Sequence, residues 1–253
     1  MHLPKITATI ITLNSEHTLE SVLKPLTELC NEIIVVDSGS TDQTVSIAEK
    51  YKCKVYYNKF EGYGKQKRYA VSLASNDWIL SIDADEVVTP ELKEEIMVLF
   101  NQDPIPYNGI YIPITLVFMG KVFRYGNEYK KKHLRLFNKT TSNFDNSSLH
   151  EKVEVKGEIY SLKNHILHYS YKDLNAYFEK FNTYSTLAAD NKIKKQQKVS
   201  IFNILLIGPW TMFYQYLIRL NIFNGFPGLV WALFSSYFAV AKYTKLYEHN
   251  KVK

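Results

Sequence analysis

The sequence has few of the residues on which stapled, metal-clustered or nucleic-acid-binding proteins depend. Its 253 residues include two cysteines, Cys30 and Cys53, and both lie in segments whose pattern predicts a core position. They provide neither a disulfide framework nor the spacing of a metal site, so a reducing compartment is expected. No basic run is as long as a nucleic-acid-binding arm, and the net charge of +6 is too small to favour nucleic acid as a partner.

The first residues also show no secretion signal. The segment 1–5 leads directly into a strand-like run, without an apolar stretch followed by a small-residue cleavage site. We therefore expect the chemistry to take place in the cytoplasm. Hydrophobic residues make up 46% of the chain, which is enough for a sizeable core. The mild positive charge suits a phosphorylated substrate or an anionic membrane surface.

Apolar runs and helical patterns alternate over the first 100 residues. Thr89 and Pro90 form an N-cap followed by proline at the first helical position. Ser40, with Gln43 three residues later, matches a capping box. Strands that alternate with helices predict an α/β fold, a parallel sheet covered on both faces. The expected strands are 6–13, 32–36, 54–57 and 78–82, and the expected helices are 19–26, 40–51, 65–74 and 90–100.

Three carboxylates, Asp83, Asp85 and Glu86, come directly after the last of these apolar runs. Like charges this close raise each other's pKa values, so a cation is expected to offset them, usually a divalent metal with bound phosphates. Asp85 is the better metal ligand, Asp83 is expected to hold ribose or the water shell of the metal, and Glu86 is expected to be structural. Such oxygen ligands favour Mg²⁺ or Mn²⁺ as the cofactor.

Two further polar turns follow expected strands, at the carboxyl ends where parallel sheets bind ligands. Asp37 opens the flexible turn Ser-Gly-Ser-Thr, and its carboxylate can accept hydrogen bonds from a base edge or from ribose hydroxyls. Asn14 and Glu16 end the first strand, and their position beside Asp37 predicts contact with a nucleoside. Asp42 serves either this ligand or the amino terminus of the next helix.

A basic loop with two glycines, Gly-Tyr-Gly-Lys-Gln-Lys-Arg at 62–68, opens the third expected helix. Helix amino termini with basic side chains are suited to phosphate, and Lys65 is the expected contact. For Lys67 and Arg68, a ligand contact and a solvated basic face are equally consistent with the sequence.

The pattern changes after the first hundred residues to short strand-like runs, which predict a mixed extension of the sheet with loops for an acceptor. An amphipathic helix is expected over 173–191, followed by a basic linker, 192–198. The segment 199–247 is strongly apolar and aromatic but is interrupted by Gly208-Pro209. Two short helices in a membrane interface fit this interruption better than a bilayer span or a hairpin packed on the globular part.

Together, these motifs resemble the nucleotide-binding half of family 2 glycosyltransferases. The later segments HLRLFNK, LHEKVEVKG and HILHYSY, with the tail NGFPGLVWALFSSYFAVAKYTKLYE, resemble the small bacterial branch that glucosylates the lipopolysaccharide core. The resemblance implies a GT-A fold followed by a helical, membrane-associating segment. It implies a transferase domain over 1–191, with a nucleotide-binding part to about 106 and an acceptor part beyond it, and a tail over 192–253.

The resemblance also implies roles for single residues. Asn14, Glu16 and Asp37 would bind the nucleoside of the sugar donor, and Asp85 would bind the metal that bridges its diphosphate. Arg135 is expected either to meet the diphosphate or to form a structural ion pair.

An inverting transfer also needs a general base that takes the proton of the attacking hydroxyl. Many family members supply it from a Glu-Asp pair, and in this chain His150-Glu151 stands at that place. Glu151 is therefore the expected base, with His150 to orient it or to ligate the metal, and Glu128 is the second candidate. His165 and His168 are assigned no chemistry.

The expected activity is a metal-dependent, inverting transfer of a hexose, glucose from UDP-glucose, to the lipopolysaccharide core or another lipid-anchored glycan. The expected location is the cytoplasmic face of the bacterial inner membrane, with peripheral or monotopic attachment to its anionic surface. One alternative is a transferase that uses polyprenyl phosphate as its acceptor. An alternative of another class is a non-catalytic scaffold on the membrane, which the intact Asp83 and Asp85 disfavour.

Overall fold

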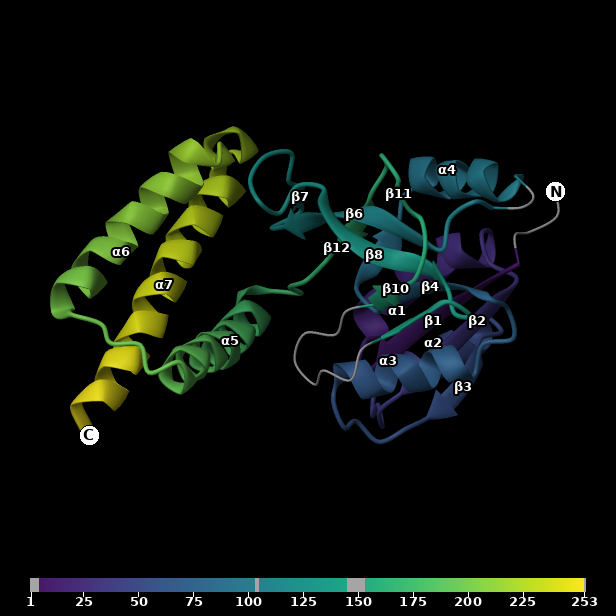
Figure 1. Cartoon of the computed structure of the whole chain (residues 1–253), viewed down its shortest axis with the longest axis horizontal. Coiled ribbons are helices and arrows are strands. Elements are labelled where there is room, and N and C mark those ends of the chain that lie inside the picture. The colour runs from purple at the N-terminus through teal and green to yellow at the C-terminus, as the bar shows by residue number, and fades with distance from the viewer. Residues whose placement is uncertain (1–4, 103–104, 145–152, 253) are drawn as a thin grey trace. The chain divides into compact units, whose positions relative to one another are not determined.

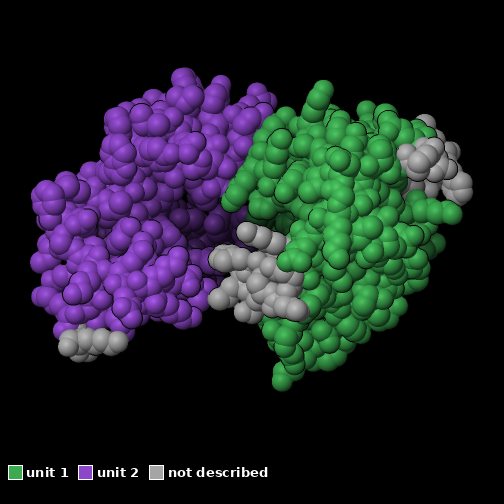
Figure 2. Space-filling model, in the orientation of Figure 1, with its two compact units in different colours: residues 1–115, 130–169 green, residues 116–129, 170–253 purple. Residues whose placement is uncertain are grey.

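The computed structural model describes residues 5–102, 105–144 and 153–252, which form two compact units (Figure 2). Unit 1 comprises residues 1–115 and 130–169, and unit 2 comprises residues 116–129 and 170–253. Each unit has a hydrophobic core of its own. The domain boundary expected at residue 191 falls inside a helix of unit 2.

Strands and helices alternate in the first part of unit 1, as the sequence predicts. The elements are β1 (Ile6–Thr12), α1 (Glu16–Thr27), β2 (Glu32–Asp37), α2 (Thr44–Lys50), β3 (Lys54–Tyr57), α3 (Tyr63–Ser72), β4 (Trp78–Asp83), β5 (Glu86–Val88) and α4 (Pro90–Phe100). Strands β3, β2, β1 and β4 lie side by side in that order, and all neighbours are parallel (Figure 1).

The second part of the chain extends this sheet with antiparallel pairs of strands and with a parallel pair. Its strands are β6 (Gly109–Phe118), β7 (Lys121–Val122), β8 (Lys131–Asn138), β9 (Ser142–Phe144), β10 (Val153–Val155), β11 (Ile159–Ser161) and β12 (Ile166–His168). The pairs of β4 with β8 and of β8 with β6 are antiparallel, and that of β6 with β11 is parallel. The order continues from β4 through β8, β6 and β12 to β5, while β9 and β10 form a separate pair. The mixed extension expected from the sequence is therefore confirmed.

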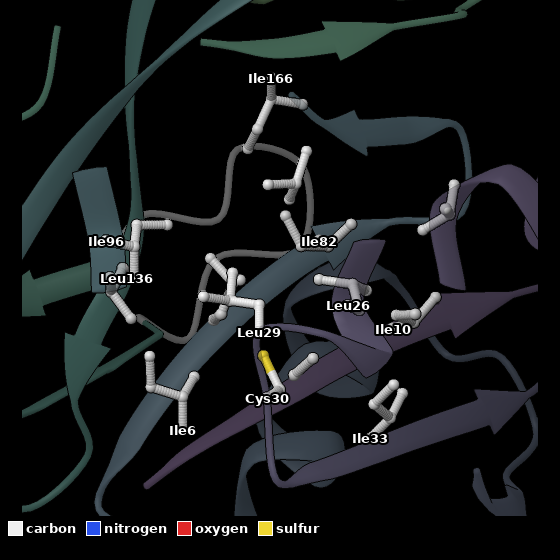
Figure 3. Close-up of a cluster of buried hydrophobic side chains, with 14 of the residues drawn as sticks. Ile6, Ile10, Leu26, Leu29, Cys30, Ile33, Ile82, Ile96, Leu136 and Ile166 are labelled. Carbon is white, nitrogen blue, oxygen red and sulfur yellow. The ribbon is translucent and has the colours of Figure 1, made fainter. Parts of the chain in front are cut away.

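The alternation of side chains along the strands builds a core on each face of the sheet. On β2, Ile33 and Val35 join the larger cluster with α1, α2 and α4, whereas Ile34 and Val36 face α3 on the other side. Figure 3 shows Leu26 of α1 within the larger cluster, together with side chains from the strands. Helices therefore cover both faces of the parallel strands, and the loops at the strand ends are available for chemistry.

The two helix starts predicted from capping motifs have different outcomes. At α4 the prediction is confirmed, because the Thr89 hydroxyl accepts a hydrogen bond from the Leu92 N–H and Pro90 is the first helical residue. At α2 the capping box is wrong, because the helix begins only at Thr44. The Ser40 hydroxyl instead donates to Asp37 in the preceding turn.

Unit 2 consists mainly of helices: α5 (Leu174–Lys194), α6 (Ile201–Phe213) with a π-helical turn (Tyr214–Ile218), a short 3-10 turn (Asn221–Asn224) and α7 (Phe226–Val252). Helices α6 and α7 run side by side, and α5 also packs on α7 (Figure 1). Their core is aromatic, and its buried members are Leu116, Phe118, Phe123, Tyr177 and Phe181.

The break expected at Gly208-Pro209 is wrong, because helical structure continues from residue 201 to residue 218. Gly208 lies against α7 so closely that a Cβ atom there would approach Val240 Cγ2 to 2.9 Å. The Ser236 hydroxyl donates a hydrogen bond to the Gly208 carbonyl at 2.8 Å. The glycine thus serves the close packing of α6 on α7, and Ser236 of α7 adds a hydrogen bond across this contact.

Glu32, at the start of β2, generates a testable prediction about stability. Its carboxylate accepts hydrogen bonds from Thr7 Oγ1 (2.5 Å), Lys54 Nζ (2.6 Å) and Ser75 N (2.8 Å). Burial acts to raise the pKa of Glu32, but these donors outweigh it and lower the pKa to about 2. We expect Glu32→Gln to lower the free energy of unfolding at pH 7 by roughly 3 kcal/mol, measured by urea denaturation.

The sign of the pH dependence follows from the lowered pKa. The contribution of Glu32 is complete above about pH 5, and it is lost as the pH falls toward the folded-state pKa, so Glu32→Gln and the wild type should converge in acid. Glu20→Gln is the matched control, since Glu20 pairs with Lys50 on the exposed surface and should contribute little. A stability difference that does not change with pH would contradict the assignment to Glu32.

Candidate functional site

The polar ends of three parallel strands meet at one edge of the sheet in unit 1. Thr12 lies opposite Asp37 in the register of β1 and β2, and Ile11 lies opposite Asp83 in the register of β1 and β4. The loops that follow these strands are therefore neighbours, as the sequence predicts. Such an edge is where open α/β sheets bind ligands.

The side chain of Asp37 shapes its own turn. Its Oδ2 atom accepts hydrogen bonds from the N–H groups of Gly39 and Ser40, each at 2.8 Å, and its Oδ1 atom accepts one from the Ser40 hydroxyl at 2.5 Å. Gly39 has a φ of +102°, which explains a glycine at this position. Asp37 is buried and fixes the loop in which it stands, while a carboxylate keeps further lone pairs for a ligand.

Asn14 and Glu16 tie the loop after β1 to the loop after β2. Asn14 Oδ1 accepts a hydrogen bond from the Thr41 N–H at 2.9 Å, and Glu16 Oε2 accepts one from the Gln43 N–H at 3.0 Å. Asn14 has a φ of +50°, a conformation that asparagine tolerates better than most residues. The structure thus brings both predicted nucleoside contacts to the same loop pair as Asp37.

Asp42 has a visible role within this loop pair. Its carboxylate accepts hydrogen bonds from the N–H and hydroxyl groups of Thr44, at 3.0 and 2.5 Å, and from the Glu16 N–H at 3.2 Å. Burial acts to raise the pKa of Asp42, but the bonds from Thr44 and Glu16 lower it overall. Of the two roles left open by the sequence, these contacts favour support of the start of α2.

Two basic side chains neutralise Asp83. Lys67 Nζ lies 2.9 Å from Asp83 Oδ1, and Arg135 Nη2 lies 2.6 Å from Asp83 Oδ2. Burial acts to raise the pKa of Asp83, but the charges of Arg135 and Lys67 hold it well below its usual range. The cation that the acid cluster requires is therefore supplied partly by the chain itself, and both carboxylate oxygens of Asp83 are engaged.

Arg135 also neutralises Glu86, whose side chain is 1% exposed. Its Nη2 atom lies 2.5 Å from Glu86 Oε1, and Glu86 Oε2 accepts a hydrogen bond from the Asp83 N–H at 3.1 Å. Burial and the neighbouring charge of Asp83 raise the pKa of Glu86. These contacts agree with the structural role expected for Glu86. For Arg135, they form the structural ion pair that was one of its two expected roles.

A β-bulge positions Arg135. The register of β6 and β8 shifts between Ile110 and Tyr111, which pair with Leu136 and Leu134, so that Arg135 is the extra residue on β8. Bulges of this kind redirect a side chain and are frequent next to active sites. No periodic pattern in the sequence indicates this shift.

Asp85, the predicted metal ligand, lies beside His168. The distance between Asp85 Oδ1 and His168 Nε2 is 3.3 Å, and the two side chains are 27% and 32% exposed. The antiparallel pairing of β5 with β12 places His168 opposite Glu86, and the Tyr169 N–H donates to the Asp85 carbonyl at 2.8 Å. Burial acts to lower the pKa of His168, but the Asp85 carboxylate outweighs it and raises the pKa.

This pair fits a divalent metal whose remaining ligands come from water and from a bound phosphorylated molecule. In the described part of the chain, no group of three or more His, Cys, Asp or Glu residues is arranged to hold a metal ion. Asp85 and His168 nevertheless present a carboxylate oxygen and an imidazole nitrogen close together and partly open to solvent. Carboxylates suit Mg²⁺ and Mn²⁺ alike, whereas the imidazole favours Mn²⁺, because Mg²⁺ prefers oxygen ligands.

Within the basic loop, the structure distinguishes Lys67 from the expected contact, Lys65. Lys65 is exposed and pairs with Glu61 at 3.0 Å, whereas Lys67 is buried and reaches Asp83. A signal for this difference exists in the sequence. Lys67 stands three and four residues before Ala70 and Val71, which lie on the buried face of α3.

The remaining candidates are not among the described residues of unit 1. His150 and Glu151 lie outside the described residues, so the proposed general base has no position in the structure. Glu128 lies in unit 2, where its carbonyl accepts a hydrogen bond from the Leu116 N–H at 2.9 Å. His168 was missed by sequence reasoning as a member of the site, and for Lys67 the sequence left a ligand contact and a solvated face open.

Comparisons with known proteins agree with this arrangement. The model of the family described as Glycosyl transferase family 2 matches residues 7–155, more than half of the chain. An uncharacterized glycosyltransferase of Rickettsia conorii is 34% identical over 265 residues, which cover 97% of this chain and 91% of the relative. The lipopolysaccharide core biosynthesis glycosyltransferase LpsC of Rhizobium meliloti is 28% identical over 266 residues, covering 99% of this chain and 96% of the relative.

Among solved structures, the crystal structure of S. aureus TarS 1–349 aligns with 98% of this chain and 92% of its own, at 14% identity and a TM-score of 0.48. The family match extends from β1 to β10 and so contains Asn14, Asp37, Asp83 and Asp85. The parallel strands, the mixed extension and the polar edge give a GT-A-like α/β fold. The chain therefore belongs to the family 2 glycosyltransferases and is itself a glycosyltransferase.

Proposed function

We propose that this glycosyltransferase moves a hexose, glucose from UDP-glucose, to the lipopolysaccharide core or another lipid-anchored glycan, with inversion at the anomeric carbon. The observation that carries the proposal is the pairing of Asp85 with His168 beside the neutralised Asp83, at the carboxyl edge of the sheet. Similarity to LpsC over nearly the whole chain supports the lipopolysaccharide core as the acceptor class.

The sugar donor would occupy the polar edge of unit 1. Asn14, Glu16 and Asp37 would contact its nucleoside, since they line the two loops that the hydrogen bonds hold together. Asp85 and His168 would hold a divalent metal, which when bound stabilises the negative charge of the departing diphosphate. The engaged oxygens of Asp83 favour a role for this residue in fixing the edge and meeting ribose rather than in binding metal.

The transfer is a single displacement at the anomeric carbon. The oxygen of the acceptor hydroxyl forms a bond to the anomeric carbon, while the bond from that carbon to the diphosphate oxygen breaks and its electron pair leaves with UDP. The hydroxyl proton passes to a general base, for which Glu151 remains the candidate, with His150 beside it in the sequence. Glu128 remains the second candidate.

The apolar surface of unit 2 supports a membrane location. In helical segment 201–218, Gly208 is the one buried residue, and by length and composition the segment is apolar enough to cross a membrane. Basic residues stand at both of its ends, Lys198 before it and Arg219 after it. The proposed arrangement is peripheral or monotopic attachment at the cytoplasmic face of the bacterial inner membrane. The exposed apolar side chains are Ile201, Phe202, Leu205, Leu206, Trp210, Phe213, Leu217 and Ile218.

The exposed apolar helix is equally compatible with a polyprenyl-phosphate acceptor, which makes this the second candidate function. Analysis of the glycosylated product after incubation with each acceptor separates the two. A non-catalytic scaffold with the same fold would have no need for Asp85 and His168 at an open edge. If the protein were such a scaffold, it would release no UDP from any nucleotide sugar.

Substitution of Asp85 tests the proposed metal. We expect Asp85→Asn to lower UDP release from UDP-glucose by about 100-fold or more, because the metal no longer stabilises the leaving diphosphate. Binding of Mn²⁺, followed by the electron paramagnetic resonance of the free ion, should weaken in parallel. Asp77→Asn is the matched control, since Asp77 is exposed at the other end of β4. Unchanged turnover in Asp85→Asn would show that the metal hypothesis is wrong.

Substitution of His168 tests its membership of the site. We expect His168→Gln to weaken Mn²⁺ binding by about 10- to 100-fold while the Mg²⁺-supported activity changes less, because the imidazole is the ligand that distinguishes the two ions. The pair of measurements, Mn²⁺ affinity and the ratio of activities with the two metals, is the readout. Equal losses with both metals would indicate a role in folding or in orienting Asp85 instead.

The membrane location is tested by removing apolar side chains from α6. The double variant Leu206→Ser/Trp210→Ser should bind neutral phosphatidylcholine vesicles at least about tenfold more weakly in a flotation assay, because two large apolar side chains no longer enter the interface. Tyr57→Ser/Val98→Ser is the control, with exposed side chains of unit 1. Equal binding of both double variants would contradict attachment through α6.

A further inference from the structure

A basic cavity lies in unit 2, where the link between α5 and α6 meets α7 at Tyr243. Its volume is about 290 Å³, near the lower end of ligand-sized pockets, which begin at about 300 Å³. Lys192 and Lys198 line it, together with Asn203, Ile207 and the ring of Tyr243. These residues belong to α5, to the link, to α6 and to α7, so the cavity is formed by the packing of this unit.

Lysine side chains gather around Tyr243 without an acidic partner. Lys192 Nζ lies 4.9 Å from the centroid of the Tyr243 ring, and Lys242 Nζ lies 4.8 Å from it. In the described ranges, the Nζ atoms of Lys192, Lys198 and Lys242 all lie more than 4.0 Å from any carboxylate oxygen. Lys192 donates instead to the neutral Gln197 Oε1 at 2.8 Å. Burial and the charge of Lys192 lower the pKa of Lys242.

The same cavity adjoins the amino terminus of α6. Ser200 is the N-cap, and its hydroxyl accepts a hydrogen bond from the Asn203 N–H at 3.2 Å. The partial positive charge of a helix amino terminus adds to that of the lysines. The next side chains, Ile201 and Phe202, are 57% and 69% exposed. A positive cavity is thus joined directly to an exposed apolar helix, which is the pattern that suits an anionic head group attached to a hydrocarbon chain.

We propose that this cavity binds the phosphate group of an anionic membrane lipid, whose head group has no cation to offset the phosphate charge, with Lys192 and Lys198 as its charge-assisted hydrogen-bond donors and Tyr243 in its lining. The assignment of the phosphate to a lipid depends on the membrane location proposed above. The existence of the cavity does not depend on it. Such a site would fix the position of α6 along the bilayer surface, beyond the general attraction of basic residues to anionic lipid.

The test compares two charge-matched double variants of the full chain. Lys192→Gln/Lys198→Gln removes the cavity lysines, and Lys194→Gln/Lys195→Gln removes two exposed lysines of the same segment that do not line the cavity. Flotation is measured with phosphatidylcholine vesicles and with mixed phosphatidylcholine–phosphatidylglycerol vesicles. We expect the cavity variant to lose about tenfold or more of its affinity for the mixed vesicles relative to the control variant, and both variants to bind the neutral vesicles equally.

A second arm distinguishes a lipid from a free phosphate. Inorganic phosphate is titrated without vesicles and followed by ³¹P NMR. Saturable binding that the cavity variant alone loses supports the site and assigns it to soluble phosphate, whereas a loss confined to vesicles supports the site and assigns it to lipid. Equal losses in the two double variants, or no loss in either, would overturn the proposal. UDP release from UDP-glucose, measured on the same samples, tests the proposed function separately, because neither variant changes a residue of unit 1.

Discussion

The site in unit 1 depends on the charge balance around Asp83. Lys67 from α3 and Arg135 from the bulge on β8 each bind one of its oxygens, and Arg135 also binds Glu86. Without these partners, the half-buried Asp83 at the end of β4 and the buried Glu86 at the start of β5 would repel each other, and the loss of one partner from such a buried network is typically destabilising by several kcal/mol. The network also joins α3, β4, β5 and β8 at the edge where the loops converge.

This balance separates the roles of neighbouring acids. Asp83 and Glu86 are satisfied by the chain, so the partly exposed Asp85 is the member of the cluster left for a ligand, and it lies beside His168. The two loops after β1 and β2 are held by their own hydrogen bonds before any ligand arrives. A site fixed in this way loses little conformational freedom when a ligand binds, which favours affinity and orientation.

Unit 2 has a different role in the proposal, which is to attach the enzyme to the membrane. Its aromatic core is buried, while α6 leaves most of its apolar side chains exposed. Gly208 allows α7 to approach, so that one side of α6 is covered and the other remains free. An enzyme held on the surface that carries its acceptor meets that acceptor at a higher effective concentration.

The sequence by itself determined the local elements and the polar edge. Apolar runs located β1 to β4, Thr89 and Pro90 located the start of α4, and the position of acids after apolar runs located Asp37, Asp83 and Asp85. These features depend on neighbours in the chain, so a local pattern is sufficient to predict them.

Only the tertiary structure decided which charged groups meet. Ser40 binds the Asp37 turn instead of capping α2, and Lys67 rather than Lys65 reaches Asp83. His168 reaches Asp85 because β12 pairs with β5, and Arg135 reaches Asp83 through a bulge in the pairing of β8 with β6. The contact of Ser40 is local, whereas those of Lys67, His168 and Arg135 join residues held by different elements and 16 to 83 positions apart in the chain. The helical period of α3 indicates that Lys67 is buried, but the pairing register that brings His168 and Arg135 to their acids is a property of the folded core, for which no single segment carries a signal.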